Sequence, residues 1–326
     1  MGRAVPLGAG VNSRLSTSDT AFLFPGQGSQ HPGMGKSLAS HYPEARRVFE
    51  EADEALGFAL SALCFEGTEE DLKKTENTQP ALLTVSTAAY RVLEGQGMRP
   101  ALVAGHSLGE YSALVAAGGL EFPDAIRLVR KRGQYMQEAV PQGVGAMAAL
   151  LKLPDGRLDD ILREAAQGEV VTAANLNSPD QIVVAGHAKA VERAMNLAKA
   201  AGARRAILLQ VSAPFHCPLM RPAQERLYPD LLSVRFKDLQ IPLINNWQAR
   251  RVLTADDALK GLSEQIPNPV RWTDTIREMA RLGIRRFVEV GPGSVLLGLS
   301  RSIDSSLPGV KFGEPGDLDK VKALLT

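Results

Sequence analysis

Residues 105–109, Gly-His-Ser-Leu-Gly, are the part of the sequence with the clearest capacity for chemistry. This G-x-S-x-G pattern lies between an expected strand at 101–105 and an expected helix at 108–118. A sharp strand-to-helix turn exposes a serine hydroxyl, and the amides at the helix start stabilise an oxyanion. The pattern therefore predicts nucleophilic catalysis by Ser107, although the same small residues also occur in structural turns.

A serine nucleophile needs a general base, and His216 is the best candidate. It lies in residues 212–218, where two prolines predict an irregular loop at the boundary between two domains, a place where clefts form. A packed loop histidine is the alternative. We expect a structural role for His106, because neighbouring residues on a sharp turn point apart. Cys217 ranks below Ser107 as nucleophile, because nothing around it predicts a lowered thiol pKa.

The helix expected over residues 123–140 carries one misplaced charge. At about 100° per residue, its apolar stripe consists of Ala125, Leu128, Val129, Met136 and Ala139. Arg132 falls in the middle of this stripe. A buried arginine is costly unless an anion pairs with it. Either a protein carboxylate or a substrate carboxylate fits, since guanidinium binds carboxylates in a bidentate manner.

The glycine-rich run at residues 24–37, FPGQGSQHPGMGKS, ends like a phosphate-binding P-loop. That motif is G-x-x-x-x-G-K-[ST], which requires glycine at position 30. The residue there is Gln30, and Pro32 adds an extra turn. We therefore disfavour nucleotide binding and expect Lys36 to be solvated.

The chain has the pattern of one small domain inserted into a larger one. Residues 143–213 give the order β-α-β-β-α-β of a ferredoxin-like unit. We expect residues 20–142 and 214–326 to form a large α/β domain, with helices at 43–56 and 80–93 and a late strand at 286–290. We leave residues 1–19 out of the fold as a leader that is disordered or a remnant of protein production.

Composition limits the classes of partner. The 326 residues are 44% hydrophobic and 22% charged, with a formal net charge of +1, so no bulk affinity for nucleic acid is expected. No apolar run has the length of a membrane span. The two cysteines favour a reduced compartment, the cytoplasm. The five histidines lack partners at metal-ligand spacing, so we expect no metal site.

Five motifs in order carry a specific resemblance: FPGQGSQ at 24–30, GHSLGEYSAL at 105–114, Arg132 25 residues after Ser107, NPVRW at 268–272 and EVGPG at 289–293. Together they resemble the malonyl-CoA:acyl carrier protein transacylases over residues 20–326. The resemblance implies an α/β fold, with an α/β-hydrolase-like large domain and an inserted ferredoxin-like small domain.

The resemblance also implies catalytic roles. Ser107 would take the malonyl group as an ester, and His216 would act first as base and then as acid. A main-chain carbonyl orients this histidine in the family, and the matching residue here is Gln265. The oxyanion hole would consist of the backbone amides of Gln27 and Leu108.

Two further positions would select the acyl group. Arg132 matches the arginine that binds the free carboxylate of malonate. Phe215 resembles the malonyl-selecting form, because its ring leaves little room for an α-methyl group. One methyl group is worth about 1–3 kcal/mol in such a pocket.

The implied reaction is a ping-pong transfer of malonyl from malonyl-CoA to the phosphopantetheine thiol of acyl carrier protein, for fatty acid synthesis. A thioester is already activated, so no cofactor is expected, and we expect a monomer. The alternatives are a trans-acting acyltransferase of a polyketide synthase, a serine hydrolase or thioesterase, and a non-catalytic module that binds a carrier protein.

Overall fold

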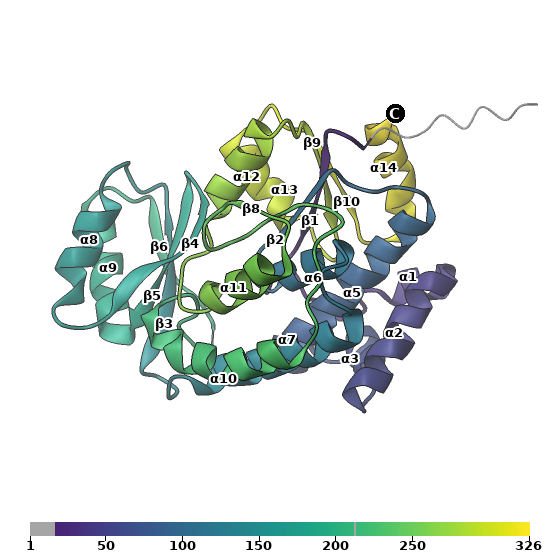
Figure 1. Ribbon diagram of the computed structural model, residues 1–326. Coiled ribbons are helices and arrows are strands. Elements are labelled where there is room, and N and C mark those ends of the chain that lie inside the picture. Colours follow the sequence, from purple (N-terminus) through teal and green to yellow (C-terminus); the bar gives the residue numbers. More distant parts are fainter. Residues whose placement is uncertain (1–16, 212) are drawn as a thin grey trace, which may run out of the picture.

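Two β-sheets organise the molecule in the computed structural model, which describes residues 17–211 and 213–326 (Figure 1). The larger sheet has the strand order β10-β9-β1-β2-β7-β8, and its neighbouring strands are parallel except for β7 and β8. Its strands are β1 Thr20–Phe24, β2 Leu102–Gly105, β7 Leu243–Ile244, β8 Arg251–Val252, β9 Arg286–Val290 and β10 Gly309–Phe312.

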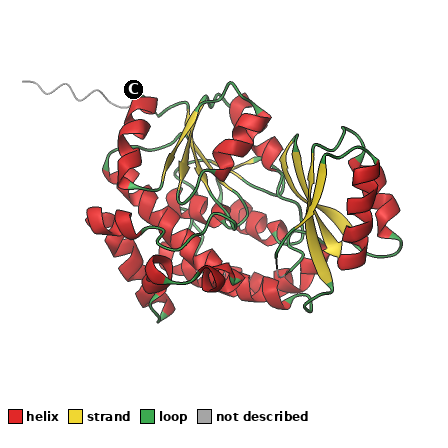
Figure 2. Ribbon diagram, turned by 180° about the vertical axis from the view of Figure 1, so that it is seen from behind, coloured by secondary structure: helices red, strands yellow, loops and turns green. Residues whose placement is uncertain are grey.

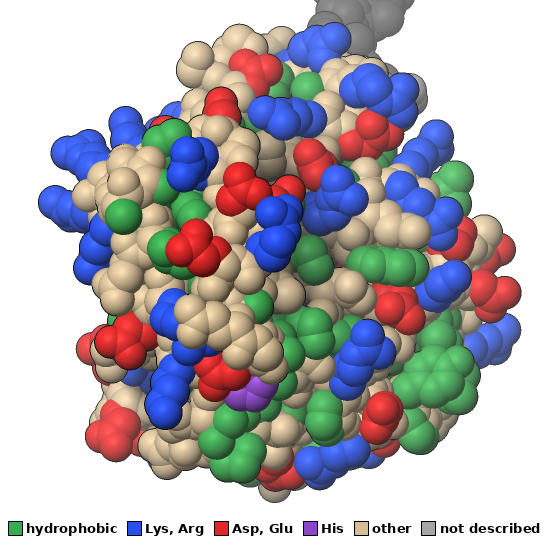
Figure 3. Space-filling model, turned by 90° about the vertical axis from the view of Figure 1, so that its left-hand side faces the viewer, with side chains coloured by type: hydrophobic (Ala, Val, Ile, Leu, Met, Phe, Trp, Pro, Cys, Tyr) green, Lys and Arg blue, Asp and Glu red, His purple; other side chains and the backbone are tan. Residues whose placement is uncertain are grey.

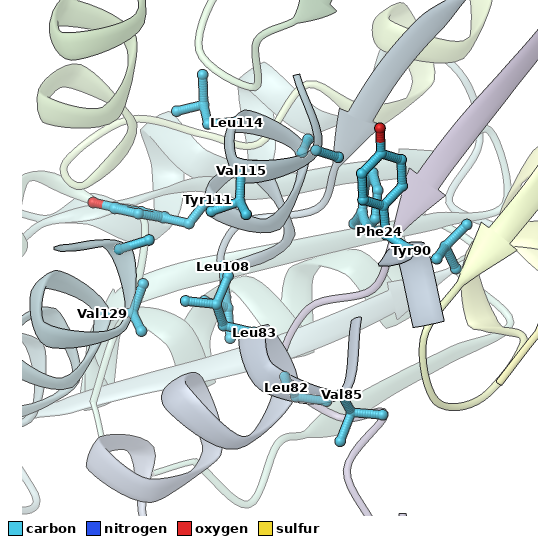
Figure 4. Packing of buried hydrophobic residues seen from close by; sticks show 14 of the residues in the cluster. Phe24, Leu82, Leu83, Val85, Tyr90, Leu108, Tyr111, Leu114, Val115 and Val129 are labelled. Carbon is cyan, nitrogen blue, oxygen red and sulfur yellow. The ribbon is translucent and has the colours of Figure 1, made fainter. Parts of the chain in front are cut away.

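Helices cover both faces of this sheet, which explains why β1 and β2 at its centre are almost entirely apolar. Ala21 and Leu23 of β1 pack with α12 Trp272–Arg281 and α13 Val295–Ile303. Phe22 and Phe24 point the other way, into the main core; Figure 4 shows Phe24 beside Tyr90, with ring centroids 6.3 Å apart. The helices of that core are α1 Lys36–His41, α2 Pro43–Leu56, α3 Leu60–Glu66, α4 Glu69–Lys73, α5 Thr75–Gly95, α6 Gly109–Ala116, α7 Phe122–Glu138, α10 Arg221–Ser233, α11 Ala255–Gln265 and α14 Leu318–Leu325.

The smaller sheet is antiparallel, with the order β4-β5-β3-β6. Two helices pack against its outer face, as Figures 1 and 2 show from opposite sides. The chain order β-α-β-β-α-β is the ferredoxin-like order expected from the sequence, so the fold class is confirmed. The exact domain limits, 143 and 213, stay a prediction. The elements are β3 Gly145–Leu151, α8 Leu158–Ala166, β4 Val171–Ser178, β5 Gln181–His187, α9 Ala188–Ala200 and β6 Arg205–Leu208.

Backbone hydrogen bonds join the edge strand β4 of the small sheet to the segment that precedes α12. The Leu176 amide donates to the Val270 carbonyl at 2.9 Å, and the Val270 amide donates to the Ala174 carbonyl at 2.8 Å. Val270 belongs to the NPVRW motif, which precedes α12. This motif therefore holds the small sheet against the large one.

Helix α5 starts at Thr75, five residues before the expected start at Pro80. Proline inside a helix removes the hydrogen bond to the carbonyl four residues earlier. That carbonyl belongs to Glu76, and it accepts a hydrogen bond from Arg130 of α7 at 3.2 Å instead. The helix continues through Pro80 because a neighbouring helix supplies the missing donor.

Charges of both signs are interspersed on the face shown in Figure 3. This surface suits the low net charge of the chain. Within residues 17–211 and 213–326, no helix is long and apolar enough to cross a bilayer. The expected leader lies outside the described residues except for residues 17–19.

Candidate active site

Ser107 occupies a sharp turn between β2 and α6. Its φ of 52° is in the left-handed region, which is uncommon for a residue other than glycine. A Cβ at Gly105 would lie 1.9 Å from the Gly109 carbonyl carbon, and one at Gly109 would lie 2.0 Å from the Phe24 oxygen. The two flanking positions of the G-x-S-x-G pattern therefore require glycine.

The Ser107 hydroxyl meets the imidazole of His216, with Oγ 2.7 Å from Nε2. On the other side of the ring, Nδ1 lies 2.9 Å from the main-chain oxygen of Gln265. This carbonyl lies at the C-terminal end of α11, where carbonyls lack intrahelical partners. An Nδ1–H donated to Gln265 leaves Nε2 as an acceptor for the serine proton, so the base needs no carboxylate partner.

The charge state of His216 suits a base. Burial, with a smaller contribution in the same direction from the positive charge of Arg132, lowers the pKa of His216 to about 3. The side chain is 3% exposed. Its imidazole is therefore neutral at physiological pH.

Arg132 is 1% exposed and points to the same hydroxyl. Its Nη2 donates to Ser107 Oγ at 3.1 Å and to Gln265 Oε1 at 2.7 Å, and its Nη1 donates to Gln79 Oε1 at 2.8 Å. Its guanidinium carbon lies 5.6 Å from the ring centre of Tyr111, one of the buried residues in Figure 4. Among residues 17–211 and 213–326, no carboxylate forms an ion pair with it.

The other predicted site residues flank this cluster. Gln27 is in the loop after β1, where Gly26 packs so closely on the elbow that a Cβ would lie 2.3 Å from the His106 oxygen. Leu108 precedes α6, so its amide belongs to a helix start. Phe215 is buried next to His216. The roles predicted for these residues remain predictions.

A groove of about 1420 Å³ leads to the loop that carries Gln27. The start of α5 and the loop after α7 form one side of it, and β3 and the end of β6 form the other. Lining residues include Gln27, Thr75, Gln134, Gly145 and Leu209. The groove is thus bordered by helices of the large domain and by the small sheet.

Two residues that hold the elbow were not predicted from the sequence. The side chain of Asn246 accepts from the Ser107 amide at 2.6 Å and donates to the Gly105 carbonyl at 2.7 Å. Asn246 follows the apolar strand β7, and a polar residue at the carboxyl end of a parallel strand was the available signal. The carboxylate of Glu110 accepts from the Asn246 amide at 3.0 Å and from Gln265 Nε2 at 2.8 Å.

Other candidates lie outside the cluster. Burial raises the pKa of Cys217 to about 12, which leaves an unreactive thiol. Lys36, from the P-loop-like run, contacts Glu66 at 3.3 Å on the surface. His106 contacts Asn177 of the small sheet at 2.8 Å. In the part of the chain that the structure describes, no three His, Cys, Asp or Glu side chains could hold a metal ion.

Residues 21–309 match the acyl transferase domain family. The chain belongs to the acyl transferase family. The match covers most of the chain, including the elbow, the histidine loop and the helix of Arg132. This protein is therefore an acyltransferase, as the ordered motifs predicted.

Named relatives are similar over nearly their whole length. The malonyl CoA-acyl carrier protein transacylase of Escherichia coli K12 is 50% identical over 90% of this chain and 96% of its own. An acyl carrier protein S-malonyltransferase from Vibrio cholerae has a solved structure with a TM-score of 0.91 at 48% identity, covering 93% of this chain and all of its own. The solved structure of a malonyl-transacylase in complex with its type II PKS acyl-carrier protein has a TM-score of 0.92 at 45% identity. The match covers 94% of this chain and 100% of that one.

Proposed function

We propose that this acyltransferase transfers malonyl from malonyl-CoA to the phosphopantetheine thiol of acyl carrier protein through a malonyl ester on Ser107. One observation carries the proposal: Ser107 Oγ lies 2.7 Å from a neutral imidazole and 3.1 Å from a buried guanidinium. The hydroxyl thus has a base for its proton and a cation for an acyl carboxylate. The names of the relatives supply the same donor and acceptor.

In the first half-reaction, His216 Nε2 takes the Ser107 proton as Oγ attacks the thioester carbonyl carbon. The oxyanion that forms accepts hydrogen bonds from the amides of Gln27 and Leu108, which we assign to the oxyanion hole. Collapse breaks the carbon–sulfur bond, and the departing CoA sulfur takes the proton from His216.

The second half-reaction repeats these steps with a different thiol. His216 takes the proton of the phosphopantetheine thiol, whose sulfur attacks the malonyl-serine carbonyl. Collapse releases Ser107 Oγ, which regains its proton from His216. The bonds that break are the thioester of malonyl-CoA and the ester of malonyl-Ser107. Both are activated toward a nucleophile, so this route needs no bound cofactor.

Arg132 provides selectivity for an acyl group with a free carboxylate, and Phe215 restricts its α-carbon. An acetyl group leaves the guanidinium without an anion, and a buried unpaired charge is costly. We expect Arg132→Ala to lower malonylation of Ser107 by about 30-fold or more, since loss of one partner of a buried charged pair costs about 2–5 kcal/mol.

The test is intact-protein mass spectrometry after brief exposure to malonyl-CoA or acetyl-CoA. Malonyl should add to the wild type and not to Ser107→Ala, and Arg132→Ala should lose malonyl loading far more than acetyl loading. Equal loss of both acyl groups would refute the role of Arg132. Release of free malonate without a thiol acceptor would favour a hydrolase instead.

Fatty acid synthesis is the route that we propose. A polyketide carrier is the second candidate, because one relative at 45% identity was solved with a type II PKS acyl-carrier protein. Discharge of malonyl-Ser107 to one carrier of each kind, at matched concentrations, distinguishes them. Both cysteines are buried and unpaired, which supports our proposal of a reduced, cytoplasmic location.

A further inference from the structure

Gln79 is a buried residue to which neither the motifs nor the proposed chemistry gives a role. It is 2% exposed and lies on α5, across from α7. Its Oε1 accepts from Arg132 Nη1 at 2.8 Å, and its Nε2 lies 3.9 Å from Met136 Sδ. A guanidinium only donates, so the amide oxygen must face Arg132 and the amide nitrogen must face the sulfur.

Two neutral oxygens thus hold a buried cation. The second is Gln265 Oε1, at 2.7 Å from Arg132 Nη2. A carboxylate at either position would hold the guanidinium and also neutralise it, whereas a carboxamide holds it and leaves the charge in place. Proteins normally pair a buried arginine with an anion, so this arrangement requires an explanation.

The nearest acid is kept apart from the arginine. Glu110 accepts from Gln265 Nε2 at 2.8 Å, so the amide of Gln265 lies between Glu110 and Arg132. The arginine also keeps a donor: its buried Nε has no partner among the described residues. Both the charge and one N–H are therefore available to a group beside Ser107.

The packing of α5 on α7 fixes this geometry. Gly133 follows Arg132, and a Cβ there would lie 2.8 Å from both the Glu76 Cα and the Thr75 oxygen. The two helix backbones consequently approach closely where Gln79 and Arg132 meet. A rigid contact between helices holds a side chain more accurately than a loop does.

We propose that Gln79 is a specificity-determining residue: its neutral amide positions Arg132 without consuming the charge that selects carboxylated acyl groups. The inference rests on the proposed function, since it assumes that the acyl group on Ser107 reaches Arg132. Gln79→Glu has nearly the same shape but adds a negative charge. It should convert the site from malonyl to neutral acyl groups such as acetyl.

The test compares wild type, Gln79→Glu and Gln79→Met, loaded with an equimolar mixture of malonyl-CoA and acetyl-CoA and analysed by intact mass. Gln79→Glu should lower the malonyl-to-acetyl ratio on Ser107 by about 30-fold or more, the scale expected for a buried charge pair. Gln79→Met has a similar length and no charge. It should slow loading of both acyl groups and change their ratio only a few-fold.

Thermal unfolding gives a second readout. Gln79→Glu should match or exceed the wild type in Tm, because it pairs a buried charge, and Gln79→Met should fall below it, because Arg132 loses an acceptor. An unchanged acyl ratio in Gln79→Glu, an equal change in both variants, or failure of Gln79→Glu to fold would each overturn the inference. Absence of malonyl on wild-type Ser107 would instead refute the proposed function.

Discussion

At the scale of single residues, the site combines a base and a cation on one hydroxyl. Ser107 Oγ lies within hydrogen-bond distance of His216 Nε2 and Arg132 Nη2. The positive charge of Arg132 opposes protonation of His216, so the residue proposed to select the substrate also keeps the base neutral. Burial has the larger effect in the same direction. Selectivity and base strength are therefore coupled in this site.

The pH dependence of acyl loading tests that coupling. The pKa of His216 is lowered to about 3, below the usual value of 6.5, so the imidazole gains a proton only in strong acid. We expect the rate of Ser107 malonylation to stay constant from about pH 8 down to about pH 5 as far as His216 is concerned. Rapid-quench single turnovers followed by mass spectrometry would measure it.

A control variant distinguishes the effect of His216 on the rate from that of a second titrating group, Glu110. Burial raises the pKa of Glu110 to about 7, and this residue contacts Gln265 beside the site. Any step in rate near neutral pH should therefore vanish in Glu110→Gln. A step near pH 6.5 that persists in that variant would show that His216 titrates normally, contrary to this account.

Site residues that break a sequence pattern could be predicted from the sequence, whereas site residues that fit an ordinary pattern could not. Arg132 was detectable because it interrupts an apolar stripe, and Ser107 because two glycines flank it. Gln79 was not detectable, since a glutamine beside Pro80 looks like the polar start of a helix. Its partner is 53 positions away, on another helix. Only packing brings the two together.

At the scale of elements, the strand-turn-helix that carries Ser107 tolerates no side chain at its two glycines. Gly109→Ala would place a methyl 2.0 Å from the Phe24 oxygen. Overpacking of this kind costs about 1–3 kcal/mol or more. We expect Gly109→Ala to lower the free energy of unfolding by at least that amount and to slow acyl loading, as measured by chemical denaturation and mass spectrometry.

Gly298 is the matched control, because it is exposed within α13 and a Cβ there meets nothing within 4 Å. Alanine is favoured over glycine in a helix by about 1 kcal/mol. Gly298→Ala should therefore be neutral or stabilising and leave loading unchanged. If Gly109→Ala behaved like this control, the close approach at the elbow would be wrong.

Element order was predictable in the small sheet, and the starts of elements were less so. The β-α-β-β-α-β order of the small sheet follows from alternating apolar patterns and turn residues. The start of α5 at Thr75 does not follow from the sequence, because a proline such as Pro80 is typical of the first turn of a helix. Pro80 is accommodated inside the helix by Arg130, a residue of α7. The sequence around Pro80 does not indicate this donor, because it lies on another helix.

At the scale of the whole molecule, the folded state depends on helices that stay packed on both faces of the large sheet. Glu289 contributes on the α13 side. This residue of β9 is 0% exposed, and its two carboxylate oxygens accept from the backbone amides of Leu296 and Leu297 at 3.1 and 2.9 Å. An acid at a helix start compensates unpaired amides. The glutamate of EVGPG thus ties strand to helix.

This attachment makes global stability depend on pH in a specific direction. Burial raises the pKa of Glu289 to about 7 from an ordinary 4.5, so between these two pH values the folded state holds a proton that the unfolded state has released. Stability from this group is present below about pH 4.5 and is lost as pH rises to about 7. The free energy of unfolding of wild type minus that of Glu289→Gln should therefore fall by up to about 3 kcal/mol over this range. Urea unfolding at pH 5 and pH 8 measures this difference in the free energy of unfolding. Glu225→Gln, at an exposed position, is the control and should show no such trend. A difference that rose with pH would mean that Glu289 is ionised in the folded protein at both pH 5 and pH 8.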